Sequence, residues 1–495
     1  FTGSTLFDQA RLAGVAEDRI PGDVTVGELF SFANAAERLY RDRGHILAYA
    51  FFPPQEVADG IFTIEIVEGA IASLTVAAPN DRFERYARRM LRPVMENTPF
   101  RIGDLERALL LINRQAGGRE GLKAQAVFTP PEDAAPGEVD LVVTVAHKPV
   151  SAALSANNRG SAYVGPWTQT AAVTFSQPFG ESEVLTFSAT AASPAKEQIS
   201  VSGRYEQMLT ESGLTGAVSF QHSISEVGHT LKVFEIESRS HSASASVNYP
   251  IVLTRSERLS VGARFDYSDS RSTILGVENS HDRLRSLTAS VAGTLPGPFD
   301  GATIVNASVT QGLPIFGATP KGDASFSRAD ATPNFTRVNA SLLHVQRLAG
   351  PTRLTLSAAG QYSFDHLPSS QEFGVGGQSY GRGYDSSEIK GEHGVAALAR
   401  FDAAVPIDRY GIDSLTPYAF FDFGATWQSD ETAADRRDTL ASTGVGADIR
   451  ALSALPIVED VSINVEAAIG LTRVPAISAD SDPDMRLYVG GAARY

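Results

Sequence analysis

The stretch LSVGARFDY, from Leu259 to Tyr267, decides the fold class because most of its alternate positions carry apolar side chains. A period of two places these side chains on one face of a β-strand and the intervening residues on the other. The same alternation recurs in LTFSA (185–189), LTLSAAGQY (354–362) and LYVGGAARY (487–495). From residue 150 to residue 495 there are roughly sixteen such segments, an even number in the range of outer-membrane barrels.

The connections between these segments alternate between short and long. QPFGE (177–181), TLPGPFDG (294–301) and RLAGPT (347–352) are short, whereas HSISEVGHTLKVFE (222–235) and GLPIFGATPKGDASFSRADATPNF (312–335) are long. Short turns on one side and long loops on the other are typical of transmembrane barrels. A soluble sandwich or propeller gives no reason for this asymmetry. The sequence therefore predicts an antiparallel transmembrane β-barrel of about 16 strands at residues 150–495.

Residues 1–149 mix helical and strand patterns and are interpreted as two copies of one unit. The first copy, residues 1–69, contains the predicted helix TVGELFSFANAAERLYRDRG (25–44), which Thr25 and Glu28 begin as a capping box. The second copy, residues 70–149, has two helical patterns between strand patterns. Each copy is predicted to run strand, helix, helix, strand, strand. We expect the opening strand of the first copy to be truncated to its end at Phe1.

The composition excludes several classes of protein. The 495 residues carry a net charge of −15, which argues against nucleic-acid binding because that function needs a basic surface. The chain has no cysteine, which excludes disulfides and thiolate metal sites. Its nine histidines form no H-x-x-x-H pair. We therefore expect neither a metal nor a cofactor.

Three stretches resemble two-partner secretion transporters, the TpsB proteins of the ShlB/FhaC/HecB hemolysin-activation type. FFPPQEVADGIFTIEIVEG (51–69) is similar to their P-Q-x-x-x-x-G segment, which ends in E-G. The two N-terminal copies resemble their paired POTRA domains. Residues 381–384 (GRGY) resemble the V-R-G-F/Y tip of a loop that folds into the barrel, with glycine in place of valine, and FFDFG (420–424) resembles their F-x-D-x-G strand. The matching positions are Pro54, Gln55, Gly60, Glu68, Gly69, Gly381, Arg382, Gly383, Tyr384, Phe420, Asp422 and Gly424.

The resemblance implies a function as well as a fold. It implies a Gram-negative outer-membrane transporter whose periplasmic POTRA domains recruit an unfolded partner exoprotein and whose lumen passes it without nucleotide. Outer-membrane lipids would surround the barrel, which we expect to be a monomer. The terminal aromatic residue, Tyr495, would serve as a signal for the barrel-assembly machinery.

The segment from Gly377 to Gly381 also matches G-x-S-x-G, the nucleophile elbow of serine hydrolases, with Ser379 at its centre. An elbow needs a strand, a sharp turn and then a helix. The residues that follow Ser379 are rich in glycine and polar side chains, and another alternating strand comes next. We therefore predict no catalytic residue and no enzymatic activity.

Arg382, between two glycines in the same loop, is the stronger candidate. A guanidinium in a confined polar lumen needs an acidic partner, and a bidentate carboxylate suits it best. Asp422 is the predicted partner, because the alternation places it opposite the apolar face of its strand. The alternative is a solvated arginine and an ordinary lumen aspartate. Gly383 is expected to adopt the positive φ that a tight tip requires.

Other functions stay open from the residues alone. A barrel-insertion factor of the same superfamily would share the fold but act on other barrels. A passive porin with accessory domains would pass small solutes and make no use of the N-terminal copies. A surface esterase acting through Ser379 is disfavoured by the missing helix.

Overall fold

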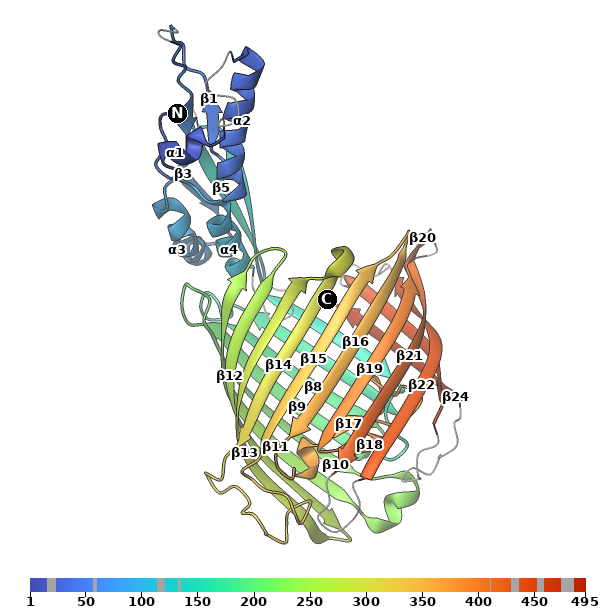
Figure 1. The fold of residues 1–495 in the computed structure, drawn as a ribbon. Helices are drawn as coiled ribbons and strands as arrows, with labels where there is room; N and C mark the ends of the chain where they lie inside the picture. Colours follow the sequence, from blue (N-terminus) through green and yellow to red (C-terminus); the bar gives the residue numbers. More distant parts are fainter. Residues whose placement is uncertain are drawn as a thin grey trace. The chain divides into compact units, whose positions relative to one another are not determined.

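The computed structural model describes residues 1–15, 24–56, 60–113, 121–131, 135–409, 411–428, 436–451, 458–472 and 485–495. They form two compact units, Phe1–Lys148 and Pro149–Tyr495 (Figure 1). Among these residues, no helix is both long and apolar enough to cross a bilayer.

The first half of unit 1 is small and packs around one long helix. Its elements are α1 (Gln9–Ala13), α2 (Val26–Asp42), β1 (Tyr49–Phe51) and β2 (Glu65–Val67). Thr25 and Glu28 form the predicted capping box at the start of α2. Ala36 and Tyr40 on the buried face of this helix pack with Leu12 and Ile66. Thr2 forms a parallel bridge with Glu65, which places the opening residues beside β2.

The second half of unit 1 is a three-stranded sheet with two helices. Its elements are β3 (Ala70–Ala77), α3 (Asp81–Glu96), α4 (Ile102–Ile112), β4 (Gly121–Thr129) and β5 (Glu138–Lys148). The strand order is β3-β5-β4, with β3 parallel and β4 antiparallel to β5. Phe83 and Leu91 on α3 and Leu141 on β5 have no exposed surface. The elements follow one another in the predicted order.

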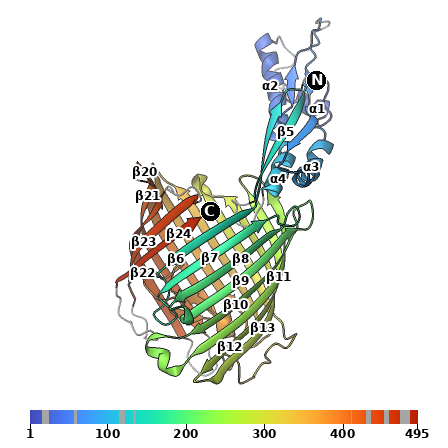
Figure 2. The same cartoon turned by 180° about the vertical axis from the view of Figure 1, so that it is seen from behind.

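Unit 2 is a closed antiparallel barrel. β24 (Met485–Arg494) pairs with β6 (Val150–Asn157) and closes it, and the two strands lie side by side in Figure 2. The strands between them are β7 (Trp167–Ser176), β8 (Val184–Ser193), β9 (Gln198–Met208), β10 (Thr215–Glu226), β11 (Glu237–Leu253), β12 (Arg258–Ile274), β13 (Val277–Pro296), β14 (Ala302–Gly312), β15 (Thr336–Arg347), β16 (Thr352–Ser363), β19 (His393–Ala403), β20 (Val405–Arg409), β21 (Ile412–Gln428), β22 (Arg436–Ala451) and β23 (Asp460–Gly470). Because β19 and β20 both pair with β21 as one interrupted strand, the described residues form 16 barrel strands, which confirms the prediction.

The connections of the barrel contain four short 3-10 helices among the described residues. These are η1 (Ala195–Glu197), η2 (His229–Phe234), η3 (Pro298–Asp300) and η4 (Ser369–Gln371). Two short strands, β17 (Phe373–Val375) and β18 (Ile389–Gly391), pair with each other within the connection from β16 to β19.

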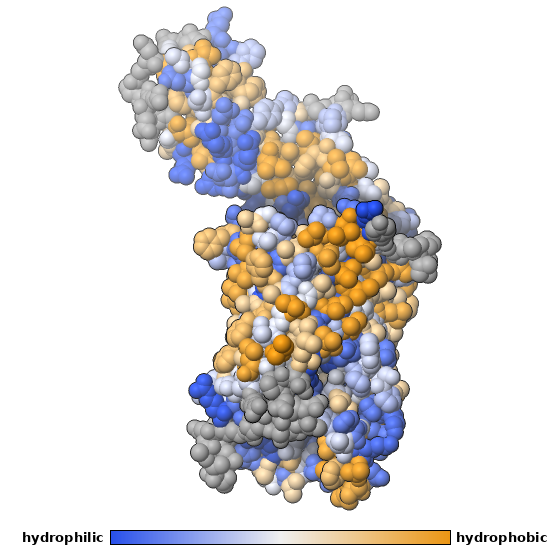
Figure 3. Space-filling view, turned by 90° about the vertical axis from the view of Figure 1, so that its right-hand side faces the viewer, coloured by the Kyte–Doolittle hydropathy of each residue, from blue (hydrophilic) through white to orange (hydrophobic). Residues whose placement is uncertain are grey.

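The alternation that predicted the barrel divides its wall into two faces. Phe421 and Phe423 are 49% and 37% exposed on the outer face, whereas Asp422 between them is 0% exposed. Figure 3 shows apolar side chains gathered over the barrel wall on the side that it draws. This outer face suits the hydrocarbon of a bilayer, and the inward polar residues keep the average hydropathy low.

Candidate functional site

The candidate site is the loop of residues 364–392, which connects β16 to β19 and lies against the inner face of the wall. A buried apolar cluster joins the loop to the wall; its members are Val375, Tyr384, Ile389, Ala396 and Leu440. At the tip, Gly381 has φ +79°, a region that favours glycine. The Tyr384 N–H donates to the Gly381 carbonyl at 3.0 Å, and the Gly377 N–H donates to the same carbonyl at 3.2 Å. The bond from Tyr384 to Gly381 closes a tight turn over residues 381–384, with Arg382 at its second position.

The Arg382 guanidinium lies between two carboxylates and an aromatic ring. Its Nη1 donates to Glu466 Oε2 at 3.0 Å, and its Nε lies 3.9 Å from Asp422 Oδ2. Its central carbon is 4.5 Å from the centre of the Phe420 ring. The arginine side chain is 11% exposed and the two carboxylates 0–1%. Charges this buried persist only when each has a partner.

Glu466 is the hydrogen-bonded partner of the arginine side chain. Its Oε2 also accepts the Tyr418 hydroxyl at 2.8 Å, and its Oε1 accepts Arg159 Nη1 at 3.1 Å. The Tyr488 hydroxyl donates to the Arg382 carbonyl at 3.0 Å. Side chains from β21, β23 and β24 therefore converge on the loop tip.

Asp422, the partner predicted from the sequence, holds the tip in another way. It accepts the backbone N–H of Arg382 at 3.4 Å and the hydroxyl of Ser442. Since these donors use its oxygens, the expected bidentate pair is not formed, and the 3.9 Å side-chain contact is too long for a hydrogen bond. Asp422 thus fixes the backbone of the tip, while Glu466 fixes its side chain.

One glycine in each of the two motifs is required because the loop and the barrel wall lie too close together for a side chain. A Cβ on Gly424 would lie 2.4 Å from Val375 Cγ1 of the loop, so this glycine lets the loop lie against the wall. A Cβ on Gly383 would lie 2.5 Å from the backbone nitrogen of Gly470 on β23. The prediction of a positive φ at Gly383 is wrong: Gly381 has that conformation, and Gly383 is needed because the tip touches the wall.

Tyr384 completes the anchor on the neighbouring strands. Its hydroxyl donates to the Thr472 carbonyl at 2.6 Å, lies 3.1 Å from the Ala441 carbonyl, and accepts the Thr472 N–H at 2.8 Å. The ring is buried in the apolar cluster that joins loop and wall. All four residues of the predicted tip motif therefore meet the barrel wall.

Sequence reasoning missed Glu466 and Arg159. The available signal was weak: Glu466 stands on the inward phase of its strand, two residues after Asn464. Many barrel strands carry such a residue, and nothing in the spacing connects position 466 with position 382.

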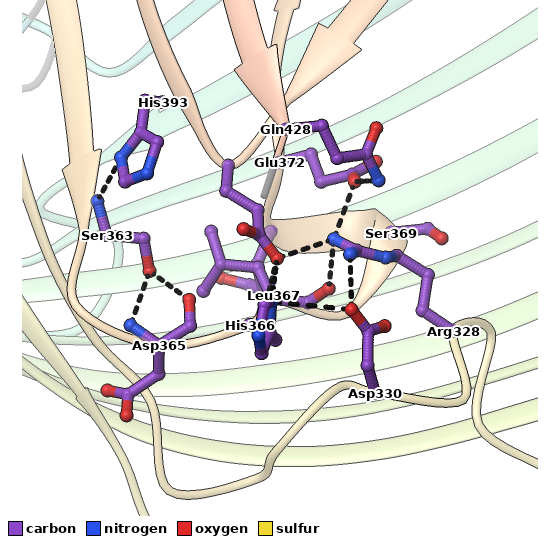
Figure 4. A network of polar contacts seen from close by, with 12 residues as sticks. Arg328, Asp330, Ser363, Asp365, His366, Leu367, Ser369, Glu372, His393 and Gln428 are labelled. Carbon is purple, nitrogen blue, oxygen red and sulfur yellow. Dashed lines mark hydrogen bonds and ion pairs between the residues drawn. The ribbon is translucent and has the colours of Figure 1, made fainter. Parts of the chain in front are cut away.

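A second ionic cluster lies at the root of the loop (Figure 4). Ligand atoms of Asp330, His366 and Glu392 lie within 4.8 Å of one another, a spacing that suits a metal ion. However, Arg328 donates to Asp330 Oδ2 and to Glu392 Oε1, both at 2.8 Å. A guanidinium in contact with two of the three donors repels a cation, so this cluster fits an internal ion pair better than a metal.

The motif of the first N-terminal copy has structural roles. Gln55, which follows Pro54 in the bend after β1, bridges to Thr63 through two hydrogen bonds of 2.8 Å. Gly60 and Gly69 have φ of +73° and +75°. Glu68 accepts the backbone N–H groups of Thr5 and Leu6, at 2.7 and 3.0 Å, and the Tyr40 hydroxyl at 2.7 Å. The motif therefore fastens the N-terminal residues to the end of β2.

Two other predicted positions lie away from the tip contacts. Tyr495 follows β24 and exchanges backbone hydrogen bonds with Ala152, so the last residue takes part in closing the barrel. Ser379 is exposed between β17 and β18, and residues 376–388 contain no helix. The strand–turn–helix setting of a nucleophile elbow is thus absent from this segment.

Comparison with known proteins fits this architecture. The profile of the Haemolysin secretion/activation protein ShlB/FhaC/HecB family matches residues 137–449. The chain belongs to this family. The profile of the ShlB-type POTRA domain matches residues 1–69. The protein is therefore an outer-membrane transporter of the two-partner secretion type, as the sequence predicted.

Similar proteins have low sequence identity to this chain but the same fold. The heme/hemopexin transporter protein HuxB of Haemophilus influenzae is 24% identical over 419 residues, which cover 83% of this chain and 72% of HuxB. CdiB from Escherichia coli superposes with a TM-score of 0.79 at 18% identity, covering 100% of this chain and 89% of CdiB. CdiB from Acinetobacter baumannii gives 0.71 at 15% identity, covering 100% and 88%. The family's barrel fold is thus kept at low identity.

Proposed function

We propose that this ShlB/FhaC/HecB-type transporter recruits one unfolded exoprotein in the periplasm and passes it through the barrel lumen. Residues 1–69 and 70–149 would be two periplasmic POTRA domains that precede the barrel. The loop tip anchored by Arg382 carries the proposal, because a passive pore does not need a buried arginine held by strands from one wall. Folding of the exported chain outside the cell would drive transport without nucleotide.

The edge of β4 offers a recruiting surface of the right chemistry. β4 pairs with β5 and with no other strand in the described part of unit 1. Asn113 accepts the Ala124 N–H at 2.5 Å and donates to the Ala124 carbonyl at 3.0 Å, so the backbone of Ala124 points away from β5. Strand alternation gives Ala126 the same direction. An extended polypeptide could therefore add to this edge through main-chain hydrogen bonds, which require no particular sequence.

The lumen wall suits a passing chain. A cavity of about 750 Å³ is lined by side chains from strands between β9 and β15, many of them serine or threonine. These hydroxyls bond to one another across strands, as Ser219 does with Ser244 at 2.7 Å and Thr288 with Thr310 at 3.0 Å. Because these hydroxyls are uncharged, they hold a passing polypeptide less strongly than charged side chains would.

Further parts of the proposal follow from the family. The barrel would work as a monomer surrounded by outer-membrane lipids, and the barrel-assembly machinery would read the C-terminal strand that ends at Tyr495. We propose that no reaction is catalysed, since the exposed Ser379 lacks the setting that activates a nucleophile.

The test is export of the cognate exoprotein, measured in the medium of cells with and without this chain. Deletion of residues 70–148 should abolish export while an inserted, heat-modifiable barrel remains. Undiminished export after the deletion would contradict the recruiting role. Loss of other outer-membrane proteins on depletion of the chain would instead favour a barrel-insertion factor. Uptake of small solutes without export would favour a porin.

A further inference from the structure

Arg328 lies at the centre of an ionic network that joins two loops. It belongs to the connection between β14 and β15, residues 313–335. Its Nη1 donates to Glu392 Oε1 at 2.8 Å and to Glu372 Oε1 at 3.0 Å, and its Nη2 donates to Asp330 Oδ2 at 2.8 Å. Glu372 and Glu392 stand near the root of loop 364–392, which carries Arg382 at its tip. Figure 4 shows Arg328 beside Glu372 and Asp330. One guanidinium thus binds carboxylates from both connections.

Further contacts tie the two loops together around this arginine. Nη1 of Arg328 also donates to the Leu367 carbonyl at 3.2 Å, and the Thr332 N–H donates to the His366 carbonyl at 3.1 Å. The Ser369 N–H donates to Ser327 Oγ at 3.1 Å. Leu367 has no exposed surface, and the Glu392 side chain is 2% exposed. The contact between the two loops therefore combines buried side chains with many hydrogen bonds.

The connection from β14 to β15 is itself fixed to the inner wall. The N–H and hydroxyl of Ser327 donate to the carboxylate of Asp282 on β13 at 2.9 and 2.6 Å. Phe326 and Ala331 pack with Leu284 of the same strand in a buried cluster. Residues 326–331 consequently span from the inner face of β13 to the root of loop 364–392.

We propose that Arg328 is a positioning residue for transport. It holds residues 326–331, which we call the strap, against the root of loop 364–392 and so keeps the Arg382 tip in place. The inference rests on the proposed transport function and adds a second anchor, at the opposite end of the same loop. The strap stays closed during export. A segment that must open repeatedly has few buried contacts, whereas this contact combines buried side chains with several hydrogen bonds to Arg328 and Glu392.

Replacing the arginine tests the strap. Arg328→Gln removes the positive charge and leaves Glu372 and Glu392 uncompensated. Since breaking a buried ion pair is strongly destabilising, the contact between the loops should weaken and export should fall at least about tenfold. Arg271→Gln is the matched control. It removes an arginine that pairs with Glu278 at 2.8 Å, with the two side chains 55% and 36% exposed. Export by the control should equal that of the wild type, and normal export by Arg328→Gln would overturn the proposal.

A structural readout separates this inference from the transport function. Purified barrels would be treated with trypsin, and cleavage after Arg382 and Lys390 would be mapped by mass spectrometry. We expect faster cleavage at both sites in Arg328→Gln and unchanged cleavage in Arg271→Gln. Unchanged cleavage in Arg328→Gln would refute the positioning role even if the exoprotein proved unsuitable for the export assay.

A disulfide lock tests whether the strap stays closed. The chain contains no cysteine, so Ser327→Cys with Ser369→Cys introduces a single possible bridge. Oxidation should leave export by the double-cysteine variant at the level of its reduced form, a comparison that cancels the loss of the Ser327 hydroxyl bond to Asp282. It should restore export in the Arg328→Gln background. A lock that blocks export when oxidised and releases it on reduction would show that the strap must open, and would overturn the proposal.

Discussion

Arg382 and Glu466 lie 84 positions apart in the chain and meet at 3.0 Å inside the barrel. Both side chains are almost fully buried, and Glu466 also binds Arg159 and Tyr418. Removing one member of such a pair strands the other charge, at a cost of roughly 3–5 kcal/mol in a fully dry site. Water in the lumen lowers that figure.

Arg382→Ala and Glu466→Ala should therefore each reduce export strongly, and the double mutant should be little worse than either single mutant. Residues that act through one interaction show coupling of roughly 0.5–3 kcal/mol in such a cycle. The Arg382–Asp422 cycle should show weaker coupling, because that contact is 3.9 Å. Arg239→Ala, in an exposed pair with Glu237 at 3.5 Å, is the control. Additive losses in the Arg382–Glu466 cycle would show that the residues act independently.

Gly383→Ala should impair export although its φ is not positive. The added Cβ would lie 2.5 Å from the Gly470 nitrogen, so the tip must move away from β23. Gly360→Ala is the matched control, because its Cβ would meet the nearest atom at 3.4 Å. Export is the measurement, with protease protection as a check on insertion. Equal export by the two variants would show that the tip tolerates displacement.

Ala126→Pro should weaken recruitment of the exoprotein. The substitution removes a backbone N–H that points away from β5, and proline is tolerated on an edge strand. Ala126→Val keeps the N–H at the same position and should export normally. Binding of an unfolded segment of the exoprotein to the purified protein would be measured for both. If the proline variant binds as well as the valine variant, the β4 edge is not the recruiting surface.

The N-terminal residues should loosen at acidic pH through Glu68. Burial acts to raise the pKa of Glu68, but hydrogen bonds from Thr5, Tyr40 and Leu6 outweigh it and hold the pKa below its ordinary value. The folded state then binds fewer protons than the unfolded state, whose glutamate has a pKa of about 4.3. The contribution of Glu68 to stability is therefore complete above that value and is lost as the pH falls through the lower, folded pKa.

Hydrogen exchange of residues 2–7 in the whole protein measures this effect. Protection should decrease between neutral and strongly acidic pH in the wild type. Glu68→Gln should start with lower protection and show a flatter pH dependence. A wild-type profile as flat as that of the variant would show that Glu68 does not hold these residues.

The wild-type protein should show only background ester turnover, and Ser379→Ala should not change it. Residues 376–388 contain no helix, so no helix N-terminus follows the serine as it does in an elbow. The assay uses a chromogenic ester with both proteins. Turnover by the wild type that the variant loses would establish a serine hydrolase and contradict the proposed absence of catalysis.

The sequence alone determined the features that repeat along the chain. The period of two in strands such as Leu259–Tyr267 depends only on which face of a strand meets lipid, so the barrel and its strand number were predictable. The capping box of Thr25 and Glu28 was predictable for a similar reason, because both residues lie within one helical turn. Alternation also placed Asp422 on the inward face.

Only the tertiary structure decided which inward groups meet. Glu466 and Arg328 reach loop 364–392 because barrel closure and loop packing bring distant segments together, and no local periodicity encodes that distance. The same holds for Gly383. A side chain is excluded there by the wall at Gly470 and not by the φ of Gly383 itself. A sequence pattern specifies the face on which a side chain lies, whereas the partner that it meets inside the barrel depends on the register and curvature of the closed barrel.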